Sequence, residues 1–449
     1  MKKEAIVYID DFEYPNYGIS YINNKKIKIK GVLPNQKVKV LKNKNKAKIV
    51  ELLGSSILER KPTCDVFNDC GGCTYQNISY EYELELKKHV VLKMLVDKDI
   101  SGYNFLGIEG SSQYAYRNKM EYSFGDLCKF GSLSLGLRKS GKYYEVVNSN
   151  TCNIVDSDFI KILFFTQNFF QNTTESFYNK KLHTGSLRHL VIRKGINTKE
   201  VLINLVTTSD FKTDTKKFVE GINNLSLLSK VNGILHTFND SLSDTVKLEK
   251  MKILYGYDYY NETICGLKFK VYPMAFFQTN TNGAEILYRV VKEFILECEK
   301  RDIIYDLYCG TGTIAQVVSS IAEEVYGIDI IKESIQVAQE NAKQNNVTNC
   351  RFYTGDVKDI LETVGKNPDI IIVDPPREGL TPKAIKKVIA LKSKYIVYIS
   401  CKPSSFVTEL IEFMNSGYYL KKLKLVDMFP KTPHVEAIGL LCLGDGDTA

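Results

Sequence analysis

The sequence predicts an α/β protein with three parts: an N-terminal β-barrel, a central α+β domain and a C-terminal doubly wound parallel sheet. The first observation is that short, lysine-rich strands with a period of two fill residues 1–58. The second is a cysteine-rich stretch followed by further strands over residues 59–272. The third is that residues 273–449 alternate helices with apolar strands, which is typical of a parallel sheet with helices on both faces.

Length and composition narrow the class of protein. The 449 residues are enough for two to four domains, and 44% hydrophobic with 25% charged residues is ordinary for a soluble globular chain. Because the sequence has neither a membrane-length apolar run nor a signal-peptide core, we expect a cytoplasmic protein with no membrane partner. The sequence indicates no obligate protein partner. In the cytoplasm, eleven cysteines favour metal binding or catalysis over disulfides.

The net charge of +8 is concentrated near the N-terminus. Residues 24–48 hold ten lysines and no Asp or Glu. Residues 26–30 alternate lysine with isoleucine, which predicts half-buried strands of a small barrel of the OB type. A lysine face on an otherwise balanced protein favours nucleic acid as the partner. The alternative is that the lysines only protect edge strands from aggregation.

Three thiols follow the predicted barrel within ten residues: Cys64, Cys70 and Cys73. A fourth ligand must come from elsewhere, and Cys128 and Cys152 are the nearest candidates. Zinc and an iron–sulfur cluster both accept four thiolates. The C-x5-C-x2-C spacing differs from the paired C-x2-C of a zinc ribbon and favours a [4Fe–4S] cluster. The alternative is a set of buried cysteines without a ligand.

The central region offers few signals of function. Residues 74–97 place apolar side chains at helical spacing among charges, so we expect an amphipathic helix that serves packing. Residues 190–195 and 201–206 predict a β-hairpin. Residues 116–119 (Tyr-Arg-Asn-Lys) combine an aromatic ring with cations, which suits nucleic acid but also occurs by chance on protein surfaces.

The C-terminal region carries a glycine turn after its first strand. The strand at 303–307 is followed by Tyr308, Cys309 and then Gly310-Thr311-Gly312, which lets the backbone approach a ligand closely. The next strand, at 325–328, ends in Asp329, which is placed to accept hydrogen bonds from ribose hydroxyls. These features predict a nucleoside-bearing cofactor. Alone they leave NAD and S-adenosylmethionine both open, because Ala315 completes a G-x-G-x-x-A pattern.

A stiff, charged segment follows the strand at 370–373. Asp374 and Arg377 flank two prolines, which form a rim without backbone donors. Hydride transfer has no evident use for this segment, whereas methylation of a planar heterocycle does. Asp374 can hold polar atoms of substrate or cofactor, and Arg377 can offset charge that appears on a ring oxygen.

Two further residues could carry the chemistry. Cys401 follows the apolar strand at 394–399, and reacting groups sit at the carboxyl ends of strands in such sheets. Its thiolate could be a nucleophile, although a lone cysteine is more often a packing residue. Glu436 precedes the strand at 437–441 and could be a general base if burial tunes its pKa. In isolation, a solvated glutamate at a strand edge is the ordinary alternative.

Together these motifs resemble a known family. The thiols, the glycine turn and the segments around Gln278, Asp374, Cys401 and Glu436 occur in the order found in S-adenosylmethionine-dependent RNA 5-methyluridine methyltransferases. The resemblance is to the ribosomal-RNA branch, which has an N-terminal TRAM domain. It implies a TRAM domain at 1–58, a central domain with the cluster at 59–272 and a Rossmann-like methyltransferase domain at 273–449.

The resemblance also implies a role for each site residue. Cys401 would be the nucleophile and Glu436 the proton-removing base. The expected cofactors are S-adenosylmethionine and a [4Fe–4S] cluster, and the expected substrate is a uridine of 23S ribosomal RNA. The residues implied at S-adenosylmethionine are Gln278, Tyr308, Asp329 and Asp374, and those implied at the cluster are Cys64, Cys70, Cys73 and Cys152.

Three other functions are weighed against this one. A transfer-RNA 5-methyluridine methyltransferase differs only in its substrate. A non-catalytic RNA-binding assembly factor would not need Cys401 and Glu436, and an NAD-dependent oxidoreductase would not need Asp374. Two departures from the family pattern are visible: residues 15–18 (Pro-Asn-Tyr-Gly) replace a more glycine-rich turn, and Asp329 stands where many relatives have Glu.

Overall fold

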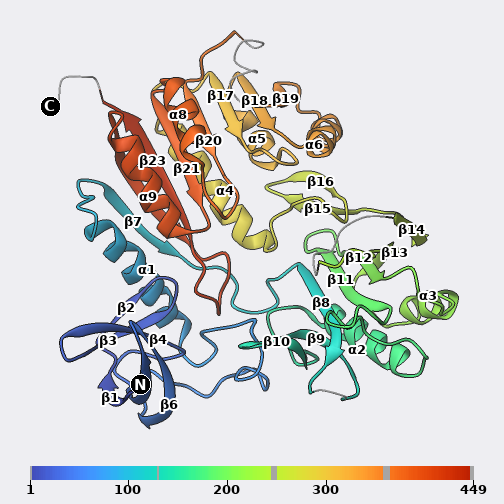
Figure 1. The fold of residues 1–449 in the computed structure, drawn as a ribbon. Helices are drawn as coiled ribbons and strands as arrows, with labels where there is room; N and C mark the ends of the chain where they lie inside the picture. The colour runs from blue at the N-terminus through green and yellow to red at the C-terminus, as the bar shows by residue number, and fades with distance from the viewer. Residues whose placement is uncertain (1–2, 129–130, 244–249, 357–364, 445–449) are drawn as a thin grey trace.

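The computed structural model describes residues 3–128, 131–243, 250–356 and 365–444. Figure 1 shows the N-terminal strands in blue at the lower left, a green central sheet at the lower right and the C-terminal sheet above them. Among the described residues, no helix is both long and apolar enough to cross a bilayer.

The N-terminal part is a curved six-stranded sheet in the order β1-β5-β6-β4-β3-β2. Ile27 and Ile29 are fully buried while the lysines beside them point outward, as the alternation predicts. The lysines of residues 24–48 are better compensated than the sequence suggested, because acids on neighbouring strands pair with three of them. The strands are β1 (Lys3–Tyr8), β2 (Asp11–Glu13), β3 (Tyr17–Ile22), β4 (Lys25–Lys30), β5 (Lys37–Asn43) and β6 (Lys46–Gly54).

Helix α1 (Tyr80–Val96) joins the N-terminal sheet to the rest of the molecule. It begins six residues later than the predicted start at 74, because the Ser79 side chain caps it by accepting from the Tyr82 amide at 3.3 Å. One side of α1 packs on the core of the N-terminal sheet through Leu86. Another side packs into the C-terminal core through Leu95.

The central sheet has seven strands in the order β10-β9-β8-β11-β12-β13-β14. The predicted hairpin is confirmed: β11 pairs antiparallel with β12. Helix α2 packs on one face with α3 beside it. The elements are β8 (Lys119–Asp126), β9 (Leu133–Lys139), β10 (Lys142–Asn148), α2 (Ser157–Gln171), β11 (Leu187–Gly195), β12 (Glu200–Thr207), α3 (Lys216–Asn223), β13 (Lys230–Phe238) and β14 (Lys250–Gly256).

The C-terminal sheet has eight strands in the order β19-β18-β17-β20-β21-β23-β22-β7. The chain runs outward from β17 and then returns to β20 on its other side. This reversal is where ligands bind in doubly wound sheets. The strands are β7 (Asn104–Glu109), β17 (Ile303–Leu307), β18 (Glu324–Asp329), β19 (Cys350–Thr354), β20 (Ile370–Val373), β21 (Tyr395–Ser400), β22 (Tyr418–Val426) and β23 (Glu436–Leu443).

Helices cover both faces of this sheet, and a hairpin connects it to the central sheet (Figure 1). These elements are β15 (Tyr260–Ile264), β16 (Leu267–Val271), α4 (Thr281–Leu296), α5 (Thr313–Val318), the 3-10 helix η1 (Ser319–Ile321), α6 (Lys332–Gln344), α8 (Pro382–Ala390) and α9 (Pro403–Met414).

Two expectations about this sheet need correction. It is mixed rather than wholly parallel, because β23 runs antiparallel to both β21 and β22. The sheets also do not follow the predicted boundary at residue 272, since β7 pairs with β22 at the edge of the C-terminal sheet. The cause is packing: Phe105 and Ile108 of β7 contact the C-terminal core. Figure 1 shows β7, coloured as early chain, beside the red C-terminal elements.

Candidate active site

The glycine turn follows β17 in an unusual backbone conformation. Tyr308 has a φ of 65°, in the left-handed region that costs a residue with a side chain about 1–2 kcal/mol. A Cβ on Gly312 would lie 2.5 Å from the Phe352 ring, so glycine is needed there for packing. A Cβ on Gly310 would meet nothing within 4 Å. The turn is therefore packed beneath Gly312 and open to a ligand at Gly310.

Asp329 lies beside this turn at the carboxyl end of β18. Its two carboxylate oxygens accept the backbone amides of Gly310 at 3.0 Å and Ile331 at 2.8 Å. These bonds fix the position of the half-buried carboxylate relative to the turn.

Asp306, on β17, is a site residue that the sequence reasoning did not single out. Its side chain is fully buried, and one oxygen accepts the Ala315 amide at 2.9 Å. The other oxygen has no hydrogen-bond partner among the described residues. Burial raises the pKa of Asp306 well above its usual range, and the nearby charges of Asp374 and Asp329 raise it further. The signal in the sequence is an acidic residue one position before the end of the strand that leads into the glycine turn.

The three carboxyl groups test the site against the expected cofactor. S-adenosylmethionine is cationic at its sulfonium and at its amino group. Asp306, with Asp329 and Asp374 near it, supplies acceptors for such a molecule, and one buried oxygen of Asp306 has no hydrogen-bond partner among the described residues. The residues therefore fit S-adenosylmethionine.

The segment after β20 brings Arg377 to His434. The Arg377 Nη2 atom lies 3.3 Å from both ring nitrogens of His434. Burial, with the charge of Arg377, lowers the pKa of His434 to about 4, so this imidazole is neutral at physiological pH. Burial raises the pKa of Asp374 to about 7.

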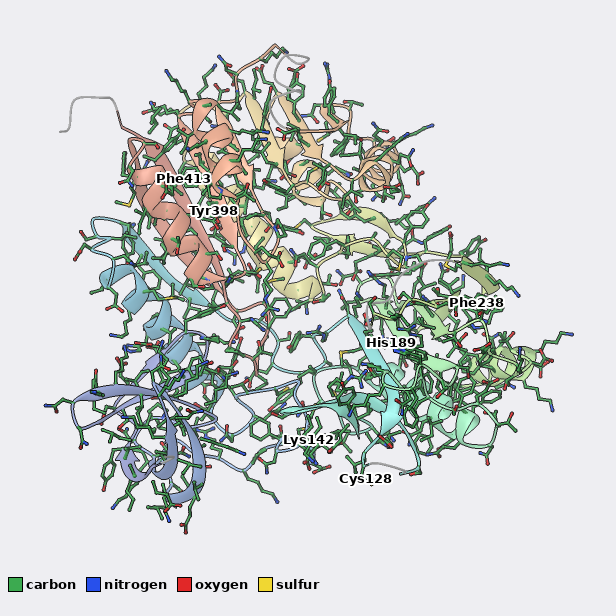
Figure 2. All side chains as sticks on the ribbon, in the orientation of Figure 1. Cys128, Lys142, His189, Phe238, Tyr398 and Phe413 are labelled. Carbon is green, nitrogen blue, oxygen red and sulfur yellow. The ribbon has the colours of Figure 1, made fainter. Side chains whose placement is uncertain are left out.

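Cys401 and Glu436 are brought together by the register of two strands. In the antiparallel pair β21–β23, Ser400 lies opposite Ala437; Cys401 follows Ser400 and Glu436 precedes Ala437, so both lie at this end of the strand pair. Figure 2 labels Tyr398, which is on the β21 strand that leads into Cys401.

The two groups influence each other electrostatically. Burial raises the pKa of Cys401 to about 12, with further contributions from the carboxylates of Glu436 and Asp374, whereas Arg377 lowers it. Burial raises the pKa of Glu436 to about 8, and Asp374 adds to this shift. A buried carboxyl group with a pKa near neutrality is suited to accept and release protons.

Gln278 stands apart from this group. The Asn118 side chain donates to the main-chain oxygen of Gln278 at 3.1 Å, which fixes the segment before α4 to the central domain. Among the described residues no hydrogen bond joins Gln278 to Asp306, Asp329 or Asp374. On α4, burial raises the pKa of the Tyr288 phenol well above its usual range, and the nearby charges of Asp374 and Asp306 raise it further.

Tyr14, in the turn after β2, also belongs to the surroundings of Cys401. Burial raises the pKa of the Tyr14 phenol; Arg377 lowers it, whereas Cys401 and Glu436 raise it further. The sequence reasoning missed this residue. Tyr14 directly precedes residues 15–18, the turn that departs from the family pattern.

The predicted thiol ligands form a separate group. Cys64, Cys70, Cys73 and Cys152 line one small apolar pocket. Burial raises the pKa of Cys73 to about 12 and that of Cys152 to about 11, and neighbouring thiols contribute to both shifts. Cys128, the other candidate for a fourth ligand, is exposed and does not line the pocket; Figure 2 shows it at the periphery of the central domain.

These thiols are not arranged for a single metal ion. In the described part of the chain, no group of three or more His, Cys, Asp or Glu side chains is close enough to hold one. A tetrahedral zinc site with bonds of about 2.3 Å needs sulfurs about 3.8 Å apart.

Comparison with known proteins gives a consistent result. Residues 241–443 match a family model described as tRNA (uracil-5-)-methyltransferase. The chain is 45% identical over 442 residues to an uncharacterized RNA methyltransferase of Clostridium tetani, with 97% of each chain covered. It is 45% identical to another from Caldanaerobacter subterraneus, covering 97% of this chain and 98% of the relative.

A solved structure is similar over nearly the whole chain. It is the tRNA (uracil-54, C5)-methyltransferase of Pyrococcus abyssi in complex with S-adenosyl-L-homocysteine, at 25% identity and a TM-score of 0.76. The similarity covers 97% of this chain and all of the other. S-adenosyl-L-homocysteine is what S-adenosylmethionine becomes when it has given up its methyl group, so this likeness supports S-adenosylmethionine over NAD.

Proposed function

This chain belongs to the S-adenosylmethionine-dependent RNA 5-methyluridine methyltransferase family, and from that premise we propose that it methylates C5 of a specific uridine in 23S ribosomal RNA. The observation that carries the proposal is the juxtaposition of Cys401, which follows β21, and Glu436, which begins β23, the strand paired with β21. A nucleophile and a carboxylate base on one face of a strand pair can act on neighbouring atoms of one ring.

The reaction proposed for these residues is covalent catalysis. The Cys401 thiolate adds to C6 of uracil, and the electron pair of the C5–C6 double bond moves onto C5 and the O4 oxygen. Arg377 stabilises the negative charge that develops on the ring. Bound S-adenosylmethionine supplies the methyl group that the electron-rich C5 accepts.

The remaining step restores the aromatic ring. The Glu436 carboxylate removes the proton from C5, and the electrons of the C5–H bond re-form the C5–C6 double bond. As this double bond forms, the C6–S bond breaks, and its electron pair leaves with Cys401 as the thiolate. Because the uracil must leave its stack to reach Cys401, a loop or single strand of RNA is the least costly target.

For the cofactor we propose contacts with five residues. Asp329 accepts from the ribose hydroxyls, while Asp306 and Asp374 face the cationic part. Tyr308 lines the pocket in its strained conformation, and Gln278 contacts the cofactor from the segment before α4.

Replacing Asp329 with alanine is expected to weaken S-adenosylmethionine binding about 10- to 100-fold, because hydrogen bonds to a charged group are worth roughly 1.5–3 kcal/mol. Isothermal titration of the protein with S-adenosylmethionine measures this without RNA. Asp329→Glu, which keeps the carboxylate, is the matched control and should bind nearly as the wild type does. Wild-type affinity in Asp329→Ala would contradict the assignment.

Transfer RNA is the second candidate substrate. It is favoured by the similarity to the tRNA (uracil-54, C5)-methyltransferase of Pyrococcus abyssi. Ribosomal RNA is favoured by the lysine-bearing N-terminal sheet, which we propose is a TRAM domain that binds RNA phosphates, and by the four grouped cysteines.

Unmodified 23S ribosomal RNA and transfer RNA, each incubated with the protein and S-adenosylmethionine, separate the two substrates. Mass mapping of 5-methyluridine should find one modified site in 23S ribosomal RNA and none in transfer RNA. The reverse result would establish the second candidate. Absence of methylation from both would leave the non-catalytic assembly factor as the remaining interpretation.

We also propose that Cys64, Cys70, Cys73 and Cys152 hold a structural [4Fe–4S] cluster, since these four thiols line one pocket. Protein purified without oxygen should contain about four iron atoms and four inorganic sulfides per chain. Cys73→Ser should lose most of both, whereas Cys128→Ser, at an exposed thiol outside the pocket, should retain them. Equal iron in the two variants would refute the ligand set.

A further inference from the structure

The loop at residues 427–435, named here the base loop, connects β22 to β23 and ends at Glu436. Its two ends are paired, since Val426 lies opposite Glu436 in the sheet. Any movement of the base loop therefore moves the start of β23, where the proposed base sits. The contacts of this loop reach across the whole molecule.

Five successive carbonyl groups of the base loop each accept a hydrogen bond from another part of the chain. The donors come from the segment after β7, from the cap of α4, from α1, from the segment before β8 and from the segment after Cys73. The pairs are Ser111 to Asp427 at 2.7 Å, Asn280 to Met428 at 2.8 Å, Lys87 to Phe429 at 3.3 Å, Tyr116 to Pro430 at 3.0 Å, and the amides of Thr74 and Tyr75 to Lys431 at 2.7 and 3.1 Å.

Lys87 is the charged member of this set, and it is almost completely buried. Its Nζ atom donates to Glu83 Oε1 and to Asp427 Oδ1, both at 2.8 Å, in addition to the Phe429 carbonyl. The Lys87 side chain is 2% exposed and its two carboxylate partners are fully buried. One ammonium group thus uses all three of its donors, two of them on the base loop.

Glu83 extends the contact to a second position on the loop. Its Oε1 atom accepts the Lys431 amide at 2.7 Å, and its Oε2 atom lies 3.6 Å from Lys431 Nζ. Lys431 has a φ of 68°, a conformation that residues with side chains rarely adopt. The Glu83 contacts hold the loop in this conformation. Glu83, Lys87, Asp427 and Lys431 together are named the four-charge cluster.

A buried cluster of charged side chains contributes little by itself to the stability of a fold. Well-packed apolar side chains of the same volume often stabilise a core as well as or better than buried ion pairs. Ion pairs instead fix the relative position of the segments that they join, because each charged hydrogen bond has a preferred geometry. The cluster ties two residues of α1 to the loop that precedes the base, some 340 positions later in the chain.

We propose that Lys87, acting through Asp427 and Phe429, is a positioning residue that holds the base loop so that Glu436 meets the C5 proton. The inference rests on the proposed function, and it concerns the last step of the reaction. Lys87 does not touch the substrate. Loss of Lys87 leaves Cys401, which follows β21, in place and displaces the start of β23, which carries Glu436.

This assignment has a distinctive consequence. When Glu436 is displaced, Cys401 still adds to C6 and C5 still receives its methyl group, but the C5 proton is not removed. Without the electron pair of the C5–H bond, the C5–C6 double bond cannot re-form, so the C6–S bond does not break. RNA should accumulate as a covalent adduct of the protein. A fault in folding alone would lower all steps together and would leave no adduct.

The test compares Lys87→Met with a matched variant at another buried lysine. Lys194 is 2% exposed and pairs with Asp156 and with Asp158, the latter at 2.9 Å, in the central domain. Both substitutions remove a buried ammonium from two carboxylates. Each full-length variant is incubated with S-adenosylmethionine and the RNA that the wild type methylates, and adducts are counted on denaturing gels.

The expected result is that Lys87→Met lowers kcat at least tenfold, leaves both KM values within about threefold and traps adduct as Glu436→Gln does. Lys194→Met should trap none. If Lys87→Met does not fold, Glu83→Gln, which keeps an acceptor but removes a charge, should trap adduct to a smaller extent. Absence of adduct from the folded Lys87 or Glu83 variant, while Glu436→Gln traps it, would overturn the inference. Absence of adduct from Glu436→Gln itself would instead refute the proposed function.

Discussion

Replacing Cys401 with alanine is expected to abolish methylation of the RNA, with a loss of turnover on the order of 10⁴-fold or more. The reason is that C5 of uracil is a weak nucleophile until a thiolate has added at C6, and no other side chain at the end of β21 can make that addition. Transfer of radioactive methyl groups from S-adenosylmethionine to RNA measures the loss. Binding of S-adenosylmethionine should change little, because the assigned cofactor contacts come from other residues.

Cys442→Ala is the matched control for this prediction. Cys442 is a buried thiol on β23, next to β21, and lies opposite Tyr395 at the far end of the pair. It should retain nearly full turnover. A Cys401→Ala protein that still produced 5-methyluridine would exclude the covalent route, whatever its other properties.

The second large effect is expected for Glu436→Gln, which should lower turnover about 10²- to 10⁴-fold and accumulate a Cys401–RNA adduct. The amide keeps the size of the side chain but cannot accept the C5 proton. Denaturing gels detect the adduct, and digestion followed by mass analysis should show a methylated ring. Glu409→Gln is a matched control, since Glu409 and Glu436 are equally buried at 6% exposure and Glu409, on α9, accepts a hydrogen bond from the Tyr398 phenol.

The pH dependence of this step follows from the raised pKa of Glu436. Only the ionised carboxylate can take a proton, and burial raises its pKa to about 8. The rate at which adduct is resolved should therefore rise about tenfold per pH unit below pH 8 and level off above it. A rate already maximal at pH 6 would show that Glu436 is not the base.

The parts of the fold that the sequence predicted are those with strong local signals. The strands at 303–307 and 370–373 were predicted to the residue because apolar runs there end at a glycine turn and at a double proline. The start of α1 was misjudged because Tyr75 and Ile78, in the six residues 74–79 before the helix, suggested helical spacing, whereas Ser79 caps the helix.

The parts that could not be predicted depend on distant partners. Nothing local in β23 says that it runs antiparallel to β21, yet this direction is what brings Cys401 and Glu436 to the same end of the strand pair. Asp427 reads as a polar loop residue until Lys87 is seen beside it. Tyr14 likewise comes from a turn in another sheet. Residue types at the site were thus predictable, whereas their neighbours were not.

The edge position of β7 has a consequence for synthesis of the protein. Asn104 pairs with Lys422, so the ribosome must add more than three hundred residues before this strand meets its neighbour. At about 5–20 residues per second, that interval is roughly 16–64 s. Throughout it, an apolar edge with open amide and carbonyl groups stays available to other nascent chains. β7 therefore has no partner strand in its sheet until almost the last strands of the chain have been synthesised.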